Sequence, residues 1–427
     1  MRDESHADGQ LLSRRDCLRL AALAGLGLAL PSWLPAPEPA PAAPQPRAKR
    51  LIWLYMAGGM SHIDTFDPKP GRPEAGPLGA IPTAVDGVRI GESLPLIAKR
   101  LDRAALVRSL TSNQGAHEQG EYLMRTGYQA RGTIQHPCLP SWISAVGGRA
   151  GTLPAAVVIN PGSRHPGAGF LAGVHAPVPI GDPAKGLAHS RRPATVSAER
   201  YRRRLDLLAA QDQAFLAIHP DRAVQAYTDL HREAVALMDS PDLAAFDLTQ
   251  EPAAARDRYG EHAFAQGCCL ARRLVENGVR AVEVTLGGWD THDDHFDRFA
   301  VNARILDGAV AALLDDLSER GLLADTLVVV ASEFGRTPVI NGNEGRDHHP
   351  KAFSALLAGA GIRPGAVHGA TDERGMAVAA DPVRPADLMA TIATALGLDP
   401  AHPAKTPDGR PITMTDKGKP IADLLVG

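Results

Sequence analysis

Short, uninterrupted apolar runs recur along the chain, and polar segments that contain glycine or proline follow several of them. The first run covers residues 51–56 and ends just before the pair Gly58-Gly59. A run of this length that is apolar throughout is typical of a strand buried on both faces of a sheet, and the two glycines indicate a turn after it. Similar runs cover residues 104–107, 155–159, 279–286 and 326–331, with a weaker one at 355–358.

Between these runs the apolar residues recur every three or four positions, which is the period of a helix with one buried face. The clearest example spans residues 296–320. Similar patterns cover residues 139–146, 200–238 and 254–277. Because fully apolar strands alternate with helices, the chain is predicted to form an α/β fold with a mostly parallel central sheet and helices on both faces.

The composition excludes several classes of protein. The chain has 427 residues, 44% of them hydrophobic, and 45 Lys and Arg against 48 Asp and Glu give a net charge of −3. This apolar content excludes a disordered chain. Because positive and negative charges are nearly equal in number, the protein has no overall positive electrostatic field that would hold nucleic acid. Four cysteines are too few for a disulfide scaffold, and the adjacent Cys268 and Cys269 are interpreted as small buried residues of a helix.

The first fifty residues differ from the rest and are typical of an export signal. Arg14 and Arg15 precede an uncharged stretch rich in Ala, Gly and Leu, residues 20–34, after which Ala and Pro alternate as far as Pro46. This order is that of a signal peptide, and the apolar stretch is too short and too often broken for a membrane span of about 20 residues. We expect residues 1–42 to be a signal peptide and residues 43–427 to be one domain. An uncleaved membrane anchor is the alternative.

The paired arginines are followed by Asp16-Cys17-Leu18 and resemble the twin-arginine (Tat) motif, with Cys17 where Phe is more usual. The resemblance implies that the Tat export machinery is a partner of the precursor. It also implies a periplasmic or secreted location, with no stable membrane span.

Acids and histidines gather directly after the predicted strands. In an open α/β sheet the carboxyl ends of parallel strands form one edge, where ligands bind, so we expect these side chains to meet there. Carboxylates mixed with imidazoles suit a hydrolytic Zn, Mn or Fe site better than a structural cysteine site, and calcium is a further candidate. The sequence predicts one or two divalent ions. The candidate ligands are Asp64, Asp290, His292, Glu333 and His348.

Several neighbours of these ligands have simpler interpretations. Asp293 and Asp294 immediately precede a predicted helix, so we expect them to cap its N-terminus. His295 suits either a solvent-facing residue of the first helical turn or a ligand. His349, beside Pro350, is expected at the surface or behind the ligands.

Five motifs, taken together and in order, resemble the bacterial family known as domain of unknown function 1501, over nearly the whole chain. Members of that family often carry a Tat signal and are placed in the alkaline-phosphatase/sulfatase-like superfamily, so the resemblance implies an alkaline-phosphatase-like fold. Two departures from the family pattern are Cys17 and His349, the latter standing where an aromatic residue is common. The motifs are GGMSHIDTFDPKP (58–70), ARRLVENGVR (271–280), GWDTH (288–292), EFGRTP (333–338) and GRDH (345–348).

The wider superfamily resemblance implies metal ligands at most of the same positions and a Ser, Thr or modified Cys nucleophile. Glu333-Phe334 stands where an Asp-His pair is expected, which removes one nitrogen ligand. LMRTG (123–127) resembles the segment that follows the sulfatase nucleophile, and counting back nine residues from Thr126 reaches His117 instead of Ser, Thr or Cys. His117 would then be a nucleophile or a ligand, or a metal-activated water would attack directly.

Two cations complete the predicted site. Arg336 and Lys69 could balance the charge of a phosphate or sulfate oxyanion, and surface salt bridges are the equally weighted alternative. The leading hypothesis is an exported metal-dependent hydrolase of a phosphate or sulfate ester, acting on a small-molecule or glycan substrate. The alternative is a catalytically inactive member of the superfamily that binds an anionic glycan or a protein partner.

Overall fold

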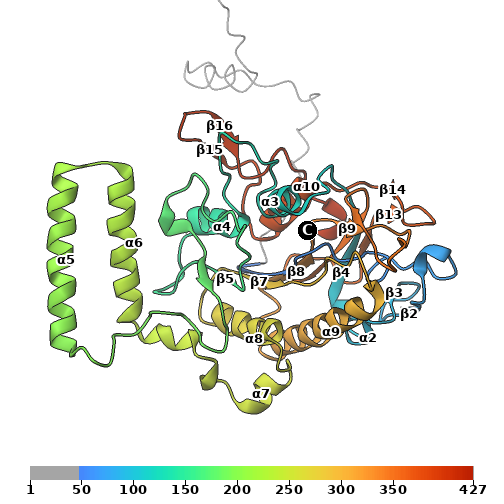
Figure 1. The fold of residues 1–427 in the computed structure, drawn as a ribbon, viewed down its shortest axis with the longest axis horizontal. Helices are drawn as coiled ribbons and strands as arrows, with labels where there is room; N and C mark the ends of the chain where they lie inside the picture. Colours follow the sequence, from blue (N-terminus) through green and yellow to red (C-terminus); the bar gives the residue numbers. More distant parts are fainter. Residues whose placement is uncertain (1–47, 427) are drawn as a thin grey trace, which may run out of the picture. The chain divides into compact units, whose positions relative to one another are not determined.

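A computed structural model describes residues 48–426 of the chain, in which an eight-stranded sheet lies between two layers of helices (Figure 1). The strand order is β12-β4-β11-β8-β1-β7-β5-β6. Strand β11 pairs antiparallel with β4 and β8, whereas the other pairings in the sheet are parallel. The predicted fold class, a mostly parallel sheet with helices on both faces, is confirmed. The strands are β1 (Arg50–Met56), β4 (Ala104–Leu110), β5 (Ala156–Ile159), β6 (Val178–Ile180), β7 (Ala281–Leu286), β8 (Thr326–Ala331), β11 (Phe353–Gly359) and β12 (Val367–His368).

Alternate residues of the central strands enter two separate cores. In β1, one layer of helices packs against Ile52, Leu54 and Met56. The other layer packs against Trp53 and Tyr55. Successive side chains of a strand point to opposite faces, so a run that is apolar at every position supplies both cores. This explains why the strand segments read as continuous apolar runs.

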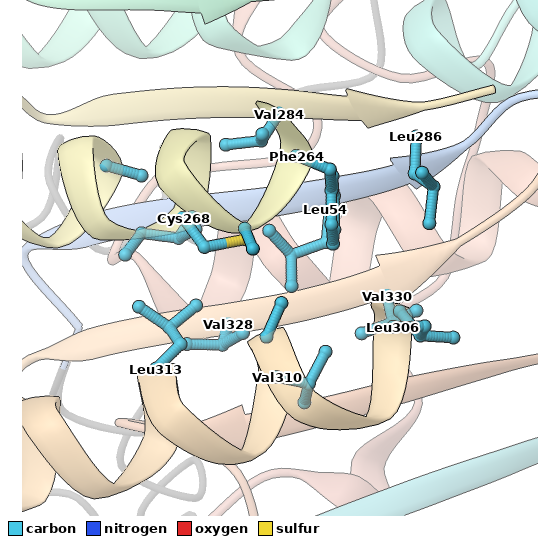
Figure 2. Packing of buried hydrophobic residues seen from close by; sticks show 14 of the residues in the cluster. Leu54, Phe264, Cys268, Val284, Leu286, Leu306, Val310, Leu313, Val328 and Val330 are labelled. Atoms are coloured by element: carbon cyan, nitrogen blue, oxygen red, sulfur yellow. The ribbon is translucent and has the colours of Figure 1, made fainter. Parts of the chain in front are cut away.

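One face of the sheet is covered by α8 (Ala263–Glu276) and α9 (His295–Glu319), with the short α2 (Pro95–Ala98) beside α9. Figure 2 shows Cys268 of α8 and Val310 of α9 packed against strand residues such as Val328. Cys138, Cys268 and Cys269 are all buried and unpaired, as the composition predicted for the adjacent pair.

The other face is covered by α4 (Leu139–Gly147) and α10 (Pro385–Ala395), together with α3 (His117–Thr126). Trp142 of α4 and Met389 of α10 are buried in this second core. The sequence predicted α4, whereas α3 and α10 were not predicted.

Two predicted helices are each interrupted in the structure. Residues 200–238 form α5 (Ala198–Ile218) and α6 (Arg222–Met238), because Pro220 cannot continue the backbone hydrogen bonding and the Asp221 side chain accepts a hydrogen bond from the Val224 amide at the start of α6. Residues 254–277 form α7 (Ala253–Asp257) and α8, separated by Gly260, which has a positive φ of 95°. The single long helices predicted from the periodicity were therefore wrong at these two breaks.

Short antiparallel pairs of strands lie outside the eight-stranded sheet. The pair that matters for the site joins β9 (Gly335–Arg336) to β10 (His348–His349) and places His348 opposite Arg336. The other pairs are β2 (Ala80–Pro82) with β3 (Arg89–Gly91), β13 (Ala370–Thr371) with β14 (Val378–Ala380), and β15 (Pro403–Lys405) with β16 (Pro411–Thr413).

The predicted signal peptide, residues 1–42, lies outside the described residues, and the Tat motif lies outside them as well. Within residues 48–426, no helix combines the length and the apolar character that crossing a bilayer requires.

Candidate metal centre

The loops that follow three neighbouring strands lie together at one edge of the sheet. In the sheet β1 lies between β8 and β7, and all three run parallel, so the segments after Met56, Leu286 and Ala331 meet at the same edge. The approach is close. Gly58 has a φ of 118°, and a Cβ atom on it would lie 2.5 Å from the backbone nitrogen of Asp290. Only glycine fits at this position without moving the Asp290 loop.

The carboxylate of Asp290 is the centre of the site. Its Oδ1 atom lies 3.1 Å from Nε2 of His292 and 3.2 Å from Nε2 of His348. Its Oδ2 atom lies 3.3 Å from Nε2 of His117. Three imidazoles from three different segments therefore turn the same ring nitrogen toward one carboxylate.

His292 and His348 are held by hydrogen bonds at their other ring nitrogen. Nδ1 of His348 donates to the backbone carbonyl of Gly115 over 2.7 Å, and Nδ1 of His292 lies 2.8 Å from the carboxylate of Asp347. Since a carbonyl or a carboxylate can only accept, both rings donate from Nδ1, and the neutral form of each ring leaves Nε2 free to bind a cation. This is the arrangement by which proteins orient histidine ligands of metal ions.

His117 is held in the same way, by a carboxylate at its other ring nitrogen. It is the first residue of α3, and its Nδ1 lies 2.8 Å from Oε1 of Glu333. The buried Glu333 also accepts hydrogen bonds from the Gly58 amide (2.8 Å), the Tyr55 hydroxyl (3.1 Å) and the Ser332 hydroxyl (3.2 Å). Both oxygens of Glu333 are thus occupied by protein donors, and His117 is fixed with Nε2 toward Asp290.

The protonation of these groups follows from their contacts. Burial disfavours the charge on Asp290, but the hydrogen bond and charge of Arg336 outweigh it and hold the pKa of Asp290 well below its usual value. For Glu333, the hydrogen bond from His117 likewise overcomes the effect of burial and lowers the pKa. The hydrogen bond to Glu333 raises the pKa of His117, and desolvation lowers the pKa of His348. Asp290 and Glu333 are therefore ionised at neutral pH.

Arg336 lies inside the protein, beneath Asp290. Its side chain is inaccessible to solvent, and Nη2 lies 2.5 Å from Oδ1 of Asp290. The rest of its guanidinium donates to backbone carbonyls of Gly58, Gly59 and Arg346. The surface salt bridge considered as an alternative for Arg336 is excluded by this burial.

Two of the predicted site residues lie elsewhere. Asp64 is buried, and its carboxylate contacts Nε2 of His295 (2.9 Å), the Ser61 hydroxyl (2.5 Å) and the guanidinium of Arg346 (2.9 and 3.1 Å). His295 is therefore neither solvent-facing nor next to Asp290, because it is a buried partner of Asp64. Lys69 pairs with Asp67 over 3.0 Å. The predicted roles of Asp64 as a ligand and of Lys69 as an oxyanion partner stay predictions.

Among the described residues, two groups of three side chains bring potential ligand atoms within 4.8 Å of one another. The first contains His117, Asp290 and His348, and the second contains His117, Glu121 and Glu333. His292 contacts two members of the first group. Nε2 of His117 is buried without a hydrogen-bond partner and faces Asp290, which suits a position that a cation completes. Two to three imidazoles with a carboxylate are ligands typical of zinc, manganese or iron, so this donor set fits the predicted metal.

The sequence analysis missed a charged network behind Glu333. Glu121 lies one helical turn after His117, and Glu283 lies in the middle of the buried strand β7. Arg125 joins them, because its Nη1 lies 3.2 Å from Glu121 and its Nε lies 2.9 Å from Glu283. A four-residue spacing on a helix and an acid within an apolar strand were the available signals.

A family model described as protein of unknown function (DUF1501) matches residues 48–425. The chain belongs to the DUF1501 family. The match covers the loops that carry Asp290, His292, Glu333 and His348, so the candidate metal centre lies within the family domain. A comparison with curated proteins finds no match for this DUF1501 chain.

Solved structures align with the DUF1501 chain at low similarity. Lipoteichoic acid synthase LtaP from Listeria monocytogenes has 8% identity and a TM-score of 0.40, and the alignment covers 89% of this chain and 77% of that one. A protein of the alkaline phosphatase superfamily from Vibrio parahaemolyticus has 12% identity and a TM-score of 0.41, with 91% and 76% covered. BT1596, a 2-O GAG sulfatase, has 12% identity and a TM-score of 0.38, with 88% and 73% covered.

Proposed function

We propose that this chain is a metal-dependent hydrolase of phosphate or sulfate esters that works in the periplasm or outside the cell after twin-arginine export. The observation that carries the proposal is the convergence of three Nε2 atoms, from His117, His292 and His348, on the carboxylate of Asp290. A carboxylate that faces three imidazole nitrogens must be bridged by protons or by a cation, and one divalent ion could satisfy all four groups.

Asp290, His292 and His348 would hold one divalent ion, and His117 would be either a further ligand or a base. When bound, such an ion supplies Lewis-acid polarisation of an ester oxygen and a lowered pKa for a bound water, from 15.7 to about 7. The donor set permits zinc, manganese or iron, and a second ion would need the group formed by His117, Glu121 and Glu333.

The residues around the ligands have separate tasks. Glu333 fixes the tautomer of His117 through the 2.8 Å contact at Nδ1, so His117 can accept a proton at Nε2 from the attacking water. Arg336 supplies a buried positive charge beside Asp290. His117 also begins α3, whose N-terminus has no side-chain cap, and the free amide groups of such a terminus favour a bound anion.

The direct test compares purified wild type with Asp290→Ala and with Asp293→Ala, a control in the same loop whose carboxylate pairs with the exposed Arg298. We expect about one equivalent of metal in wild type and in the control and none in Asp290→Ala, measured by elemental analysis. A panel of 4-nitrophenyl phosphate, phosphodiester and sulfate esters is then assayed with added zinc, manganese or iron. Metal-loaded wild type that hydrolyses none of them would exclude the hydrolase, and metal-free wild type would exclude the site.

A second candidate function is favoured by one contact. Arg336 lies 2.5 Å from the same Oδ1 atom that His292 and His348 face, so its positive charge weakens the attraction of Asp290 for a metal ion. A member of the fold that has lost catalysis could instead use the three imidazoles to bind an anionic glycan. In that case wild type would bind a sulfated oligosaccharide without metal, and added chelator would leave the affinity unchanged.

A further inference from the structure

The segment that leaves β5 brings an arginine to the site. Asn160 ends the strand with a left-handed φ of 54°, and four residues later Nη2 of Arg164 donates to Oε1 of Glu121 over 2.6 Å. Glu121 is the buried acid whose carboxylate lies within 4.8 Å of ligand atoms of His117 and Glu333. Arg164 is therefore one side chain away from the groups that orient the candidate metal centre.

Glu121 does not depend on Arg164 for its charge balance. Its other oxygen accepts from Nη1 of Arg125 over 3.2 Å, and Arg125 is almost fully buried over the ring of Tyr55. If Arg164 leaves, Glu121 keeps a buried guanidinium partner. The contact between Arg164 and Glu121 can therefore break at lower cost than the contact between Arg125 and Glu121.

Arg164 also has hydrogen-bonding capacity to spare. Its side chain is 52% exposed, whereas that of Arg125 is 2% exposed. Among the residues that the structure describes, Glu121 is the one acceptor that Arg164 contacts. A guanidinium has five N–H groups in a planar fork that matches a carboxylate, phosphate or sulfate, so several donors of Arg164 face solvent.

The acids around the site explain why such a cation is needed. Glu118, Glu121, Glu333 and Asp290 all lie on the loops and the helix that surround His117, and an anionic substrate entering among them meets like charges. A metal ion and Arg336 offset the charge next to Asp290. Arg164 is an exposed cation in contact with one of these acids, Glu121.

We propose that Arg164 recognises a second anionic group of the substrate, a carboxylate or sulfate that is separate from the ester being cleaved. The inference deepens the proposed function and rests on it, since it names the substrate class as an ester with at least two negative groups. Arg164 would turn its free N–H groups toward that second group while Arg125 keeps Glu121 neutralised.

The test titrates full-length protein, supplied with zinc, with phenylphosphonate and with its 3-carboxy and 4-carboxy derivatives, whose carbon–phosphorus bond the proposed ester hydrolysis leaves intact. Calorimetry measures the dissociation constants. The variants are Arg164→Ala, Arg164→Gln and Arg164→Lys, and the control is Arg191→Ala, an exposed arginine later in the same segment that pairs with Asp247. Wild type and the control are expected to bind at least one carboxylated probe about tenfold more tightly than phenylphosphonate. Both neutral variants are expected to lose this preference while their affinity for phenylphosphonate stays the same.

The outcomes separate this inference from the proposed function. An equal preference in wild type and in both neutral variants overturns the role of Arg164, as does wild type that binds no probe. The variant Asp290→Ala tests the metal centre. If its affinity for all probes falls by the same factor and the preference for the carboxylated probes remains, both proposals are supported. If Asp290→Ala neither loses metal nor changes any affinity while Arg164→Ala still abolishes the preference, the hydrolase proposal fails and the anion subsite stands.

Discussion

Nε2 of His292 lies 3.0 Å from Nε2 of His348, and both rings are already held at Nδ1, one by Asp347 and the other by the carbonyl of Gly115. Two bare ring nitrogens repel each other at this distance, so either a proton or a cation must lie between them. Oδ1 of Asp290 faces both nitrogens, and in the proposed function the two imidazoles and this carboxylate would bind the same metal ion.

Removing the residue that orients His292 should weaken metal binding without unfolding the protein. Asp347 is 55% exposed, and its carboxylate accepts from Nδ1 of His292 over 2.8 Å. Loss of such an orienting carboxylate typically lowers metal affinity by about 10- to 100-fold. We expect this loss in Asp347→Ala, measured by competition with a chromogenic chelator.

Asp423→Ala is the matched control, because Asp423 is also an exposed acid that pairs with a histidine, His368. Its metal affinity should equal that of wild type. Unchanged affinity in Asp347→Ala would contradict the assignment of His292 as a ligand.

Asp64 provides a test between a ligand role and a structural role. Its carboxylate is buried between Arg346 and His295, so Asp64→Asn leaves the guanidinium of Arg346 without a charged partner. Breaking a buried pair in this way costs about 3–5 kcal/mol. We expect urea unfolding to show that loss and metal affinity to stay within about twofold of wild type.

The comparison for Asp64→Asn is Asp293→Asn, which breaks a pair with Arg298 at the surface and should cost less than about 1 kcal/mol. Loss of metal from Asp64→Asn with little change in the free energy of unfolding would restore the ligand role that the sequence predicts.

The sequence predicted the sheet, and it predicted that several of the candidate residues would lie together, because both depend on local patterns. The strands β1, β7 and β8 are mostly apolar on both faces, and each is followed by a turn that carries acids or histidines. The charged and threonine exceptions are Arg50, Glu283, Thr285 and Thr326. The rule that parallel strands share their carboxyl edge was enough to bring Asp290, His292 and Glu333 to one region.

The roles within the site could not be predicted in the same way, because they depend on partners far apart in the chain. Asp64 and Asp290 both follow buried strands, yet Asp64 meets Arg346, 282 residues away, and Asp290 meets imidazoles. Arg164 lies in the segment between β5 and β6, and nothing near it in the sequence indicates that it reaches Glu121.

The close approach of two loops predicts a large effect of a small substitution. A Cβ atom at Gly58 would lie 2.5 Å from the backbone nitrogen of Asp290, at a φ of 118°. Gly58→Ala should therefore displace the Asp290 loop, lower the free energy of unfolding by about 2–4 kcal/mol and abolish metal binding. Thermal unfolding and elemental analysis measure the two effects.

Gly71→Ala isolates the steric part of that effect. Gly71 also has a positive φ, 80°, but has no atom within 4 Å of an added Cβ. The free energy of unfolding of Gly71→Ala should fall by about 1 kcal/mol, and this variant should keep its metal. Equal losses in both variants would show that backbone strain, and not contact with the Asp290 loop, explains the need for glycine at position 58.

His62 should make the protein less stable in mild acid. Burial lowers the pKa of His62 to about 4, against the opposing influence of Asp67 and of the hydrogen bond to the Gly375 carbonyl. Below the usual pKa of 6.5, His62 takes up a proton in the unfolded chain but not in the folded chain. Its contribution to the free energy of unfolding, about 3 kcal/mol, is therefore present above pH 6.5 and lost as the pH falls to 4.

His62→Gln should flatten the dependence of unfolding free energy on pH over that window, measured by urea titration. The exposed His219→Gln should follow the wild-type curve, and because His136 titrates over the same window, the difference between curves isolates His62. Parallel curves for His62→Gln and wild type would mean that the folded protein protonates His62 as readily as the unfolded chain does.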